Sequence, residues 1–403
     1  MLQLPKLSTT QIDQANIGLM VVSLVLAYIL PFEVFLFSYA VLGPLHYLTE
    51  ISWLHQKNYF VPKVKKMSLW IFPILALVLT VVLVWDDVEE LFRKWQHLPP
   101  LKQKTFEHIW NANLIFFLFA LSLVLVLLQK VWMKVVGVAA VIILCVSMNL
   151  GQTCLSCTSK KDDSKIELCD YNKQDANKFI RNQCKDVNGN GSLDYGEDFS
   201  DSGPRWAGFT FFITAYLPTL IHVYIFTMLF MLFGAIKSKS KTGYVSIIVL
   251  VICGAMPFIW DPAFLHYTVS ESARKSYDAS FYSLNQIIFD NFTKLADTPE
   301  NIYGSSFGIM LTRFIAFAYT YHYLNWFSKT SIIQWHKMRG LNLGIVLVLW
   351  VISVTLYYYD YKTGLTMLLL LSFLHVFLEF PLNYTSFMGI VKSIFGKKKV
   401  AAT

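Results

Sequence analysis

Charged residues are scarce in this chain of 403 residues. Asp, Glu, Lys and Arg make up 15% of it, against about 25% in typical soluble domains. Hydrophobic residues account for 55% and aromatic residues for 16%. This balance excludes an ordinary soluble domain and indicates a polytopic membrane protein. The net charge of +8 comes from short basic clusters between apolar runs, as in cytoplasmic loops, so we expect no nucleic-acid partner.

Several catalytic signatures are absent from the sequence. There is no glycine-rich phosphate-binding loop, no Ser-His-Asp order and no CxxCH haem attachment motif. The HxxxH and HxxHH boxes of membrane fatty acid desaturases and hydroxylases are also missing, and no segment repeats at a fixed period. The corresponding reaction classes and repeat folds therefore have no support in the sequence.

Apolar runs long enough to cross about 30 Å of hydrocarbon recur along the chain. They predict an all-α polytopic bundle of about ten membrane spans. Leu30-Pro31 separates the first two runs, which form either two helices or one kinked helix. The expected spans lie near 13–30, 31–54, 68–85, 106–129, 132–150, 206–235, 243–260, 305–328, 342–359 and 364–382.

Basic residues follow alternate spans, which predicts the orientation in the membrane. Short loops rich in Lys and Arg remain on the cytoplasmic side. In a bacterial inner membrane this pattern places both termini in the cytoplasm and segment 151–205 in the periplasm. The basic residues are Lys57, Lys63, Lys65, Lys66, Lys130, Lys134, Lys237, Lys239, Lys241, Lys329, Lys337, Arg339, Lys397, Lys398 and Lys399.

The chain therefore divides into three parts. Spans one to five occupy 1–150, an extracytoplasmic insertion occupies 151–205, and spans six to ten occupy 206–403. An amphipathic segment near 280–295 on the outer side either lies at the membrane interface or packs over the bundle mouth.

The insertion contains a calcium-loop pattern. The sequence DVNGNGSLDYGE matches D-x-[DN]-x-[DN]-G-x₅-E, which provides oxygen ligands around a tight turn. It resembles an EF-hand or dockerin-type loop, and this implies a single structural calcium site; the alternative is an acidic turn without an ion. The expected ligands are Asp186, Asn188, Asn190, Ser192 through its carbonyl, Asp194 directly or through water, and Glu197.

The insertion is also rich in cysteine. An even number of cysteines on an oxidising side predicts two disulfides, with three connectivities open. A tetrahedral zinc site at the C-x-x-C pair is the alternative. Disulfides and calcium would stabilise a segment too small to bury its own core, which would cap or gate the bundle or bind a protein partner. The four cysteines are Cys154, Cys157, Cys169 and Cys184.

Ionisable residues recur inside the apolar runs. Two histidines are each followed at i+4 by a glutamate, so that each pair shares a helix face. Two further histidines lie at similar depth in other spans. Because such groups are costly in hydrocarbon, they usually face the bundle interior. We expect the six to meet: His46, Glu50, His222, His322, His375 and Glu379.

This donor set predicts an intramembrane metal site. Imidazoles suit iron, zinc and copper, and carboxylates serve as ligands or as outer partners that set the imidazole tautomer. We therefore expect iron or zinc, with non-haem iron favoured, and Glu50 or Glu379 as ligand, outer partner or general base. An open metal position would activate oxygen or water for reaction with a membrane lipid or another lipophilic molecule. Each histidine alone would more simply be an interhelical hydrogen-bonding contact.

A family resemblance supports this interpretation. The Gly43-Pro44-Leu45-His46 end of an early span, with the other mid-membrane histidines, resembles the Brp/Blh family of membrane enzymes. Those enzymes cleave carotene with histidine-bound iron, so the resemblance implies a metal-dependent oxygenase. The family usually has Gly and Asp after the first histidine, whereas Tyr47 and Leu48 follow here.

Two other classes of function would use the same residues. A proton- or cation-coupled transporter would use the His/Glu cluster as a relay, although no paired Gly/Pro-broken spans occur in corresponding halves. A non-catalytic subunit of a larger assembly would use the insertion as its contact surface. A bound transition metal would separate the enzyme from both alternatives.

Overall fold

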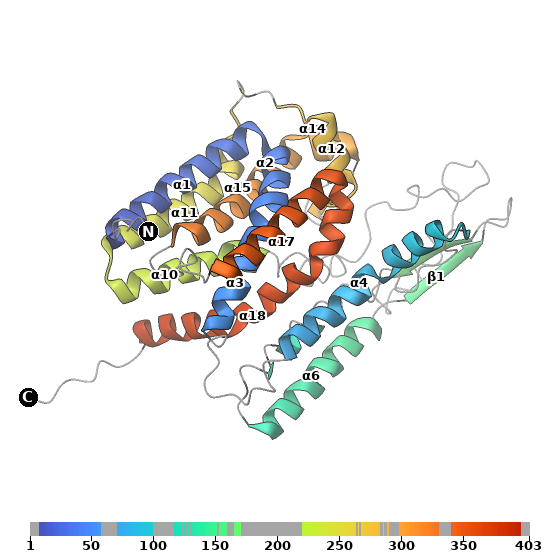
Figure 1. The fold of residues 1–403 in the computed structure, drawn as a ribbon, viewed down its shortest axis with the longest axis horizontal. Coiled ribbons are helices and arrows are strands. Elements are labelled where there is room, and N and C mark those ends of the chain that lie inside the picture. Colours follow the sequence, from blue (N-terminus) through green and yellow to red (C-terminus); the bar gives the residue numbers. More distant parts are fainter. Residues whose placement is uncertain are drawn as a thin grey trace, which may run out of the picture. The chain divides into compact units, whose positions relative to one another are not determined.

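The computed structural model is helical in the residues that it describes, apart from one short β-hairpin (Figure 1). The chain forms two compact units, one made of Met1–Val84, Pro218–Phe289 and Lys294–Thr403 and the other of Trp85–Leu217 and Asp290–Thr293. The described residues are 8–57, 71–99, most of 117–150, 153–158, 165–170, 220–262, most of 265–289, 298–329 and 340–395.

The first unit is a bundle of helices from both ends of the chain. Its N-terminal part holds α1 (Thr9–Ile29), α2 (Pro31–Phe37), the π-helical turn η1 (Ser38–Leu42) and α3 (Gly43–Gln56). Its C-terminal part holds the π-helical turn η5 (Ile221–Phe226), α10 (Thr227–Ser238), α11 (Lys241–Ile259), α12 (Glu271–Asp278), α14 (Pro299–Gly304), α15 (Ser306–Ser328), α17 (Gly340–Tyr359) and α18 (Tyr361–Phe395).

Six of the described helices are long and apolar enough to cross a membrane, as expected for a multi-pass membrane protein. Leu30 has non-helical φ and ψ of −138° and 64° between the first two, so these are separate helices. The expected spans near 106–129 and 206–235 lie wholly or partly outside the described residues, and ten spans remain a prediction. The six are Thr9–Ile29, Pro31–Gln56, Ile221–Ser238, Lys241–Ile259, Gly340–Tyr359 and Tyr361–Phe395.

Helix α15 is enclosed by the rest of the bundle. It packs against α1, α2, α3, α11 and η5 (Figure 1). It is not among the six apolar helices, because its buried positions include Thr312, Arg313, Thr320, His322 and Asn325. A helix surrounded by protein can carry these polar groups where a lipid-facing helix cannot.

Hydrogen bonds fix one end of the bundle. Asp13 Oδ2 of α1 accepts from Ser240 Oγ at 2.6 Å and from Thr242 Oγ1 at 2.8 Å. Ser328 Oγ donates to Asn16 Oδ1 at 2.8 Å. The start of α1, the turn between α10 and α11, and the end of α15 therefore lie together.

A buried arginine fixes the opposite end. Arg313 is 1% exposed, and its Nη1 lies 2.7 Å from Asp261 Oδ1. Its guanidinium also lies 4.7 Å from the ring of Tyr28, whose hydroxyl donates to the carbonyl of Trp260 at 2.8 Å. These contacts join the end of α1, the end of α11 and the first half of α15.

The loop that precedes α12 is attached at the same end through Glu33. Tyr267 donates from its hydroxyl to Glu33 Oε2 at 2.8 Å, and Ser270 Oγ donates to Oε1 at 2.8 Å. Burial and the neighbouring carboxylate raise the pKa of Tyr267. The loop is therefore held to the start of α2 by a neutral phenol and a carboxylate.

The described part of segment 280–295 packs onto the bundle. The ring of Phe281 lies 4.7 Å from that of Phe35 and 5.0 Å from that of Tyr39. Ile288 and Phe289 are also buried. These apolar side chains contact protein, which favours packing over the bundle mouth.

The second unit contains the end of α4 (Ile71–Trp95), α6 (Val131–Leu150) and a hairpin of β1 (Thr153–Thr158) and β2 (Lys165–Asp170). The two strands pair antiparallel, with Cys154 opposite Cys169. Cys184 and the predicted calcium loop, 186–197, lie outside the described residues. Their disulfide and calcium roles remain predictions.

A substitution at Gly308 tests how closely α14 and α15 pack. A Cβ on Gly308 would lie 2.2 Å from the carbonyl oxygen of Ile302, whereas a Cβ on Gly304 would meet nothing within 4 Å. Because the obstacle is backbone, we expect Gly308→Ala to destabilise the bundle by about 1–3 kcal/mol. Gly304→Ala is the matched control and should melt close to wild type in detergent. Equal melting temperatures for the two variants would contradict the packing described here.

Candidate metal centre

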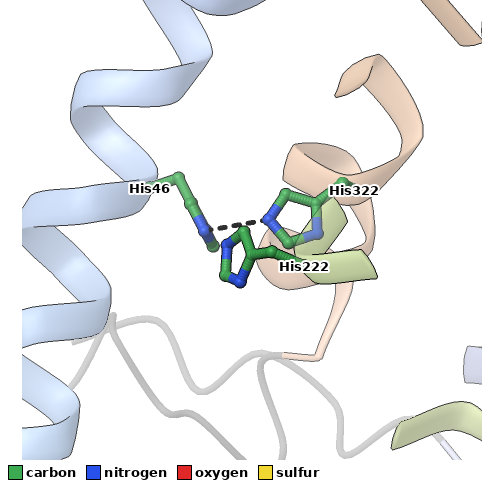
Figure 2. Close-up of side chains that lie close together, drawn as sticks. All are labelled: His46, His222 and His322. Carbon is green, nitrogen blue, oxygen red and sulfur yellow. Dashed lines mark hydrogen bonds between the residues drawn. The ribbon is translucent and has the colours of Figure 1, made fainter. Parts of the chain in front are cut away.

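Four helical elements bring six ionisable side chains together. α3 supplies His46 and Glu50, and α18 supplies a second pair at the same i, i+4 spacing, His375 and Glu379. The remaining two imidazoles come from η5 and α15. Figure 2 shows three of the rings turned toward one another. All six side chains are buried: His46, Glu50, His222, His322, His375 and Glu379.

The four imidazole rings form a closed square. The ring centroids of His46 and His322 lie 4.8 Å apart, and those of His322 and His222 lie 5.1 Å apart. The square closes through His375, which lies 5.0 Å from His222 and 5.4 Å from His46. All four pairs are T-shaped, so no imidazole lies flat against its neighbour in the square.

The nitrogens that approach each other are all Nε2. His222 Nε2 lies 3.1 Å from His375 Nε2, and His322 Nε2 lies 3.2 Å from His46 Nε2. Two nitrogens bound at about 2.1 Å to one ion lie about 3.0 Å apart in cis octahedral positions and about 3.4 Å apart at tetrahedral corners. The observed separations match those of ligands that share a metal, and they match equally an N–H···N hydrogen bond between two imidazoles.

In two of the imidazoles, a hydrogen-bond acceptor at Nδ1 sets the tautomer. The Thr227 hydroxyl donates to the carbonyl of Val223 at 2.8 Å, so its oxygen accepts from His322 Nδ1, also at 2.8 Å. His375 Nδ1 lies 3.3 Å from the carbonyl of Leu371, which can only accept. Both rings therefore carry the proton on Nδ1 and present the Nε2 lone pair to the centre.

The two glutamates occupy different positions around the square. Glu379 Oε2 lies 3.0 Å from His222 Nδ1, on the side away from the centre. Glu50 Oε2 lies 3.0 Å from His46 Nε2, the nitrogen that faces the centre. Glu379 is therefore an outer partner of His222, whereas Glu50 lies where its carboxylate can reach a metal.

Neither carboxylate contact is a well-formed hydrogen bond. The distances are short enough, but His222 Nδ1 and both oxygens of Glu50 lack a hydrogen-bond partner of good geometry among the described residues. His46 Nδ1 also lacks one. Polar groups buried without partners cost about 1–3 kcal/mol each, more when charged. An ion in the centre would compensate for this cost at the Glu50 oxygens, whereas the two Nδ1 atoms face away from the centre.

Charge balance at the two glutamates calls for a proton or a metal cation. Glu50 is 0% exposed and Glu379 is 4% exposed, and the two carboxyl groups adjoin each other. Two neighbouring carboxylates in a dry interior are strongly unfavourable, because each loses its hydration. A proton held by one carboxyl group would remove one of the two charges, and one divalent ion would offset both. The donor set, with four imidazoles and a carboxylate, suits iron, zinc or copper.

Two overlapping groups of three could hold an ion. One comprises His46, His222 and His322, and the other comprises His46, Glu50 and His375; within each group the donor atoms lie within 4.8 Å of one another. His46 belongs to both groups, while Glu379 belongs to neither. This agrees with Glu379 as an outer partner.

The π-helical turns position the centre. η5 carries His222, and η1 immediately precedes α3, which carries His46. A π-helical turn contains one more residue than an α-helical turn, so it rotates the side chains that follow it. Such turns are frequent at functional sites. Sequence periodicity did not predict either turn.

Several residues around the centre were not predicted from the sequence. Thr227 supports His322, and Asn383 Nδ2 donates to Glu379 Oε2 at 3.4 Å. Asn383 follows Glu379 at i+4, so the same spacing rule would have found it. Sequence spacing could not have found Thr227, because Thr227 lies on α10 and the residue that it contacts, His322, lies on α15.

Aromatic side chains enclose the imidazoles. The ring of Tyr47 stacks on His375 at 4.2 Å, and its hydroxyl lies 3.0 Å from that of Tyr323. Trp326 lies 5.2 Å from the ring of His46 and donates to Thr49 Oγ1 at 3.0 Å. These rings limit the access of water to the centre.

No family model, curated protein or solved structure matches the chain.

Metal analysis of purified protein tests the centre. We expect near-stoichiometric iron, zinc or copper by inductively coupled plasma mass spectrometry in the wild type and a large loss in His222→Ala. His55→Ala is the matched control, since His55 is exposed on the same helix as His46. Asp186→Ala should lose calcium and keep the transition metal. Transition metal retained in full by His222→Ala would contradict the site.

Proposed function

We propose that this chain is an integral membrane metalloenzyme that oxidises a lipophilic substrate. The single observation that carries the proposal is the meeting of four buried imidazoles in two close Nε2 pairs, from which two overlapping groups of three possible metal ligands arise. The bound metal, for which we favour non-haem iron, would supply open positions where dioxygen and substrate react. The alternatives are a coupled transporter and a non-catalytic subunit.

Each residue of the centre has a distinct role in this proposal. His46, His222, His322 and His375 are the nitrogen ligands. Glu50 is a further ligand or a general base, because it adjoins the metal-facing nitrogen of His46. The outer residues act indirectly: Glu379 orients His222, and Thr227 orients His322. Outer partners of this kind typically change metal affinity by about 10–100-fold when removed.

The surroundings of the site favour an apolar substrate. The centre is buried within helices whose outer surfaces are apolar, including exposed Val22, Val25, Ile248 and Val348. A substrate dissolved in the membrane can reach such a site laterally without crossing water. The resemblance to carotene-cleaving Brp/Blh enzymes points to the same chemical class.

We propose the following arrangement in the membrane. Lys239 and Lys329 cap α10 and α15 at the bundle end where α1 begins, which supports a cytoplasmic N-terminus in a bacterial inner membrane. About ten spans would then place both termini inside and the 151–205 insertion outside. The insertion would bind calcium through 186–197 and cap the bundle or dock a partner protein.

Oxygen labelling tests the proposed reaction. Iron-loaded protein in nanodiscs made from total membrane lipid is exposed to ¹⁸O₂, and lipid products are examined by mass spectrometry. We expect ¹⁸O in a lipid product with wild type and with His55→Ala, and none with His322→Ala. Absence of label from a fully loaded wild type would contradict an oxygenase. Gradient-driven flux in liposomes that His322→Ala abolishes would instead support the transporter.

A further inference from the structure

The dipeptide His-Tyr occurs on two helices that meet at the centre. α3 carries His46-Tyr47, and α15 carries His322-Tyr323. Like side chains meet across the two helices: Nε2 of His46 lies 3.2 Å from Nε2 of His322. The hydroxyl oxygens of Tyr47 and Tyr323 lie 3.0 Å apart, and both phenols are buried. A hydrogen-bonded phenol pair, Tyr47 and Tyr323, therefore accompanies the imidazole contact between α3 and α15.

Tyr47 restrains the plane of the His375 ring. The two rings are stacked, with their centroids 4.2 Å apart and an angle of 21° between their planes. The χ2 torsion of histidine has no sharply preferred value, so neighbouring groups must fix the ring plane. The contact of His375 Nδ1 with the Leu371 carbonyl is 3.3 Å long, beyond the usual range of about 2.7–3.2 Å. This hydrogen bond is weak, and the stack with Tyr47 adds the restraint on the ring plane that it lacks.

The ring of His46 also depends on aromatic neighbours. Its Nδ1 has no hydrogen-bond partner of good geometry among the described residues. By contrast, a hydroxyl lies 2.8 Å from Nδ1 of His322, and a carboxylate oxygen lies 3.0 Å from Nδ1 of His222. Around His46 the neighbours are the rings of Tyr323 and Trp326, with centroids at 5.3 and 5.2 Å. Tyr323 therefore restrains the one imidazole of the square that has no polar support at Nδ1.

Gly43 leaves the space in which the two phenol hydroxyls meet. A Cβ at Gly43 would lie 3.2 Å from the hydroxyl oxygen of Tyr323 and 3.2 Å from that of Tyr47. Gly43 precedes Tyr47 by four residues, so the two lie on one face of α3. A methyl group at this position would push the hydroxyls aside by a few tenths of an ångström. The packing of the phenol pair thus accounts for the glycine three residues before His46.

We propose that Tyr47 and Tyr323 are positioning residues of the metal centre. The hydrogen bond between the two phenols holds one ring against His375 and the other against His46, and the space at Gly43 permits this contact. Because the lone pair of an imidazole nitrogen lies in the plane of the ring, fixing these planes fixes the direction from which the two imidazoles meet an ion. The inference rests on the metal centre of the proposed function and applies whichever reaction the metal supports.

Copper(II) bound to the detergent-purified full chain provides the test. Imidazole nitrogens suit this ion, and its electron paramagnetic resonance spectrum reports how they are arranged around it. We expect Tyr47→Leu, which removes the stacked ring, to shift the g values and the copper hyperfine splitting and to weaken copper binding by about 10–100-fold. Tyr47→Phe keeps the stacked ring without its hydroxyl and should recover most of the affinity. Gly43→Ala separates the hydroxyls and leaves both rings in place, so it should shift the spectrum by a smaller amount than Tyr47→Leu.

Two control variants should keep the wild-type spectrum and affinity. Gly344→Ala adds a methyl group that meets nothing within 4 Å. Tyr361→Phe removes a hydroxyl on the same helix as His375, but this hydroxyl donates to the Leu36 carbonyl at 3.0 Å. If Tyr47→Leu does not fold, the comparison of Gly43→Ala with Gly344→Ala decides.

The outcomes separate the positioning role from the proposed function. Wild-type spectra and affinities in Tyr47→Leu and Gly43→Ala would overturn the positioning role and leave the metal centre intact. A wild-type chain without a copper signal that shows nitrogen coupling would overturn both. The spectra do not depend on turnover, so failure of the oxygen labelling alone would leave the positioning role supported by the shifts in the two variants.

Discussion

The cost of placing ionisable groups in a membrane interior governs this structure. A carboxylate or imidazole that is removed from water needs polar contacts within the bundle, and here the ionisable side chains contact one another. The helices that carry them therefore pack so that the square of imidazoles closes, with centroid distances between 4.8 and 5.4 Å. The enclosed position of α15 follows from the same requirement, because its polar side chains have no place at a lipid surface.

The centre is supported by groups that set the direction of its lone pairs. Thr227 and the Leu371 carbonyl hold the Nδ1 protons of His322 and His375, and Glu379 stands behind His222. An ordinary interhelical contact between two neutral imidazoles needs one Nε2 to carry a proton. The outer acceptors place the proton of His322 and of His375 on Nδ1, and these two residues belong to different contacts, one with His46 and the other with His222. Each contact can therefore be a hydrogen bond donated by Nε2 of His46 or His222, and with the Nε2 proton of these residues removed the same arrangement directs four lone pairs at a metal.

The sequence predicted the parts of the site that depend on local spacing. The i, i+4 pairs of His46 with Glu50 and of His375 with Glu379 lie on single helices, so helical periodicity was enough to place each pair on one face. The different roles of the two glutamates were not predictable, because they depend on which imidazole nitrogen each carboxylate meets across helices. The π-helical turns at Ser38–Leu42 and Ile221–Phe226 also escaped the periodicity argument, since one extra residue leaves no compositional signal.

X-ray absorption spectroscopy of the purified, metal-loaded protein tests the central claim most directly. The account predicts a first shell of nitrogen and oxygen atoms at about 2.0–2.2 Å, with outer-shell scattering that corresponds to four imidazoles. A spectrum without imidazole scattering, or with sulfur in the first shell, would contradict a metal held by His46, His222, His322 and His375.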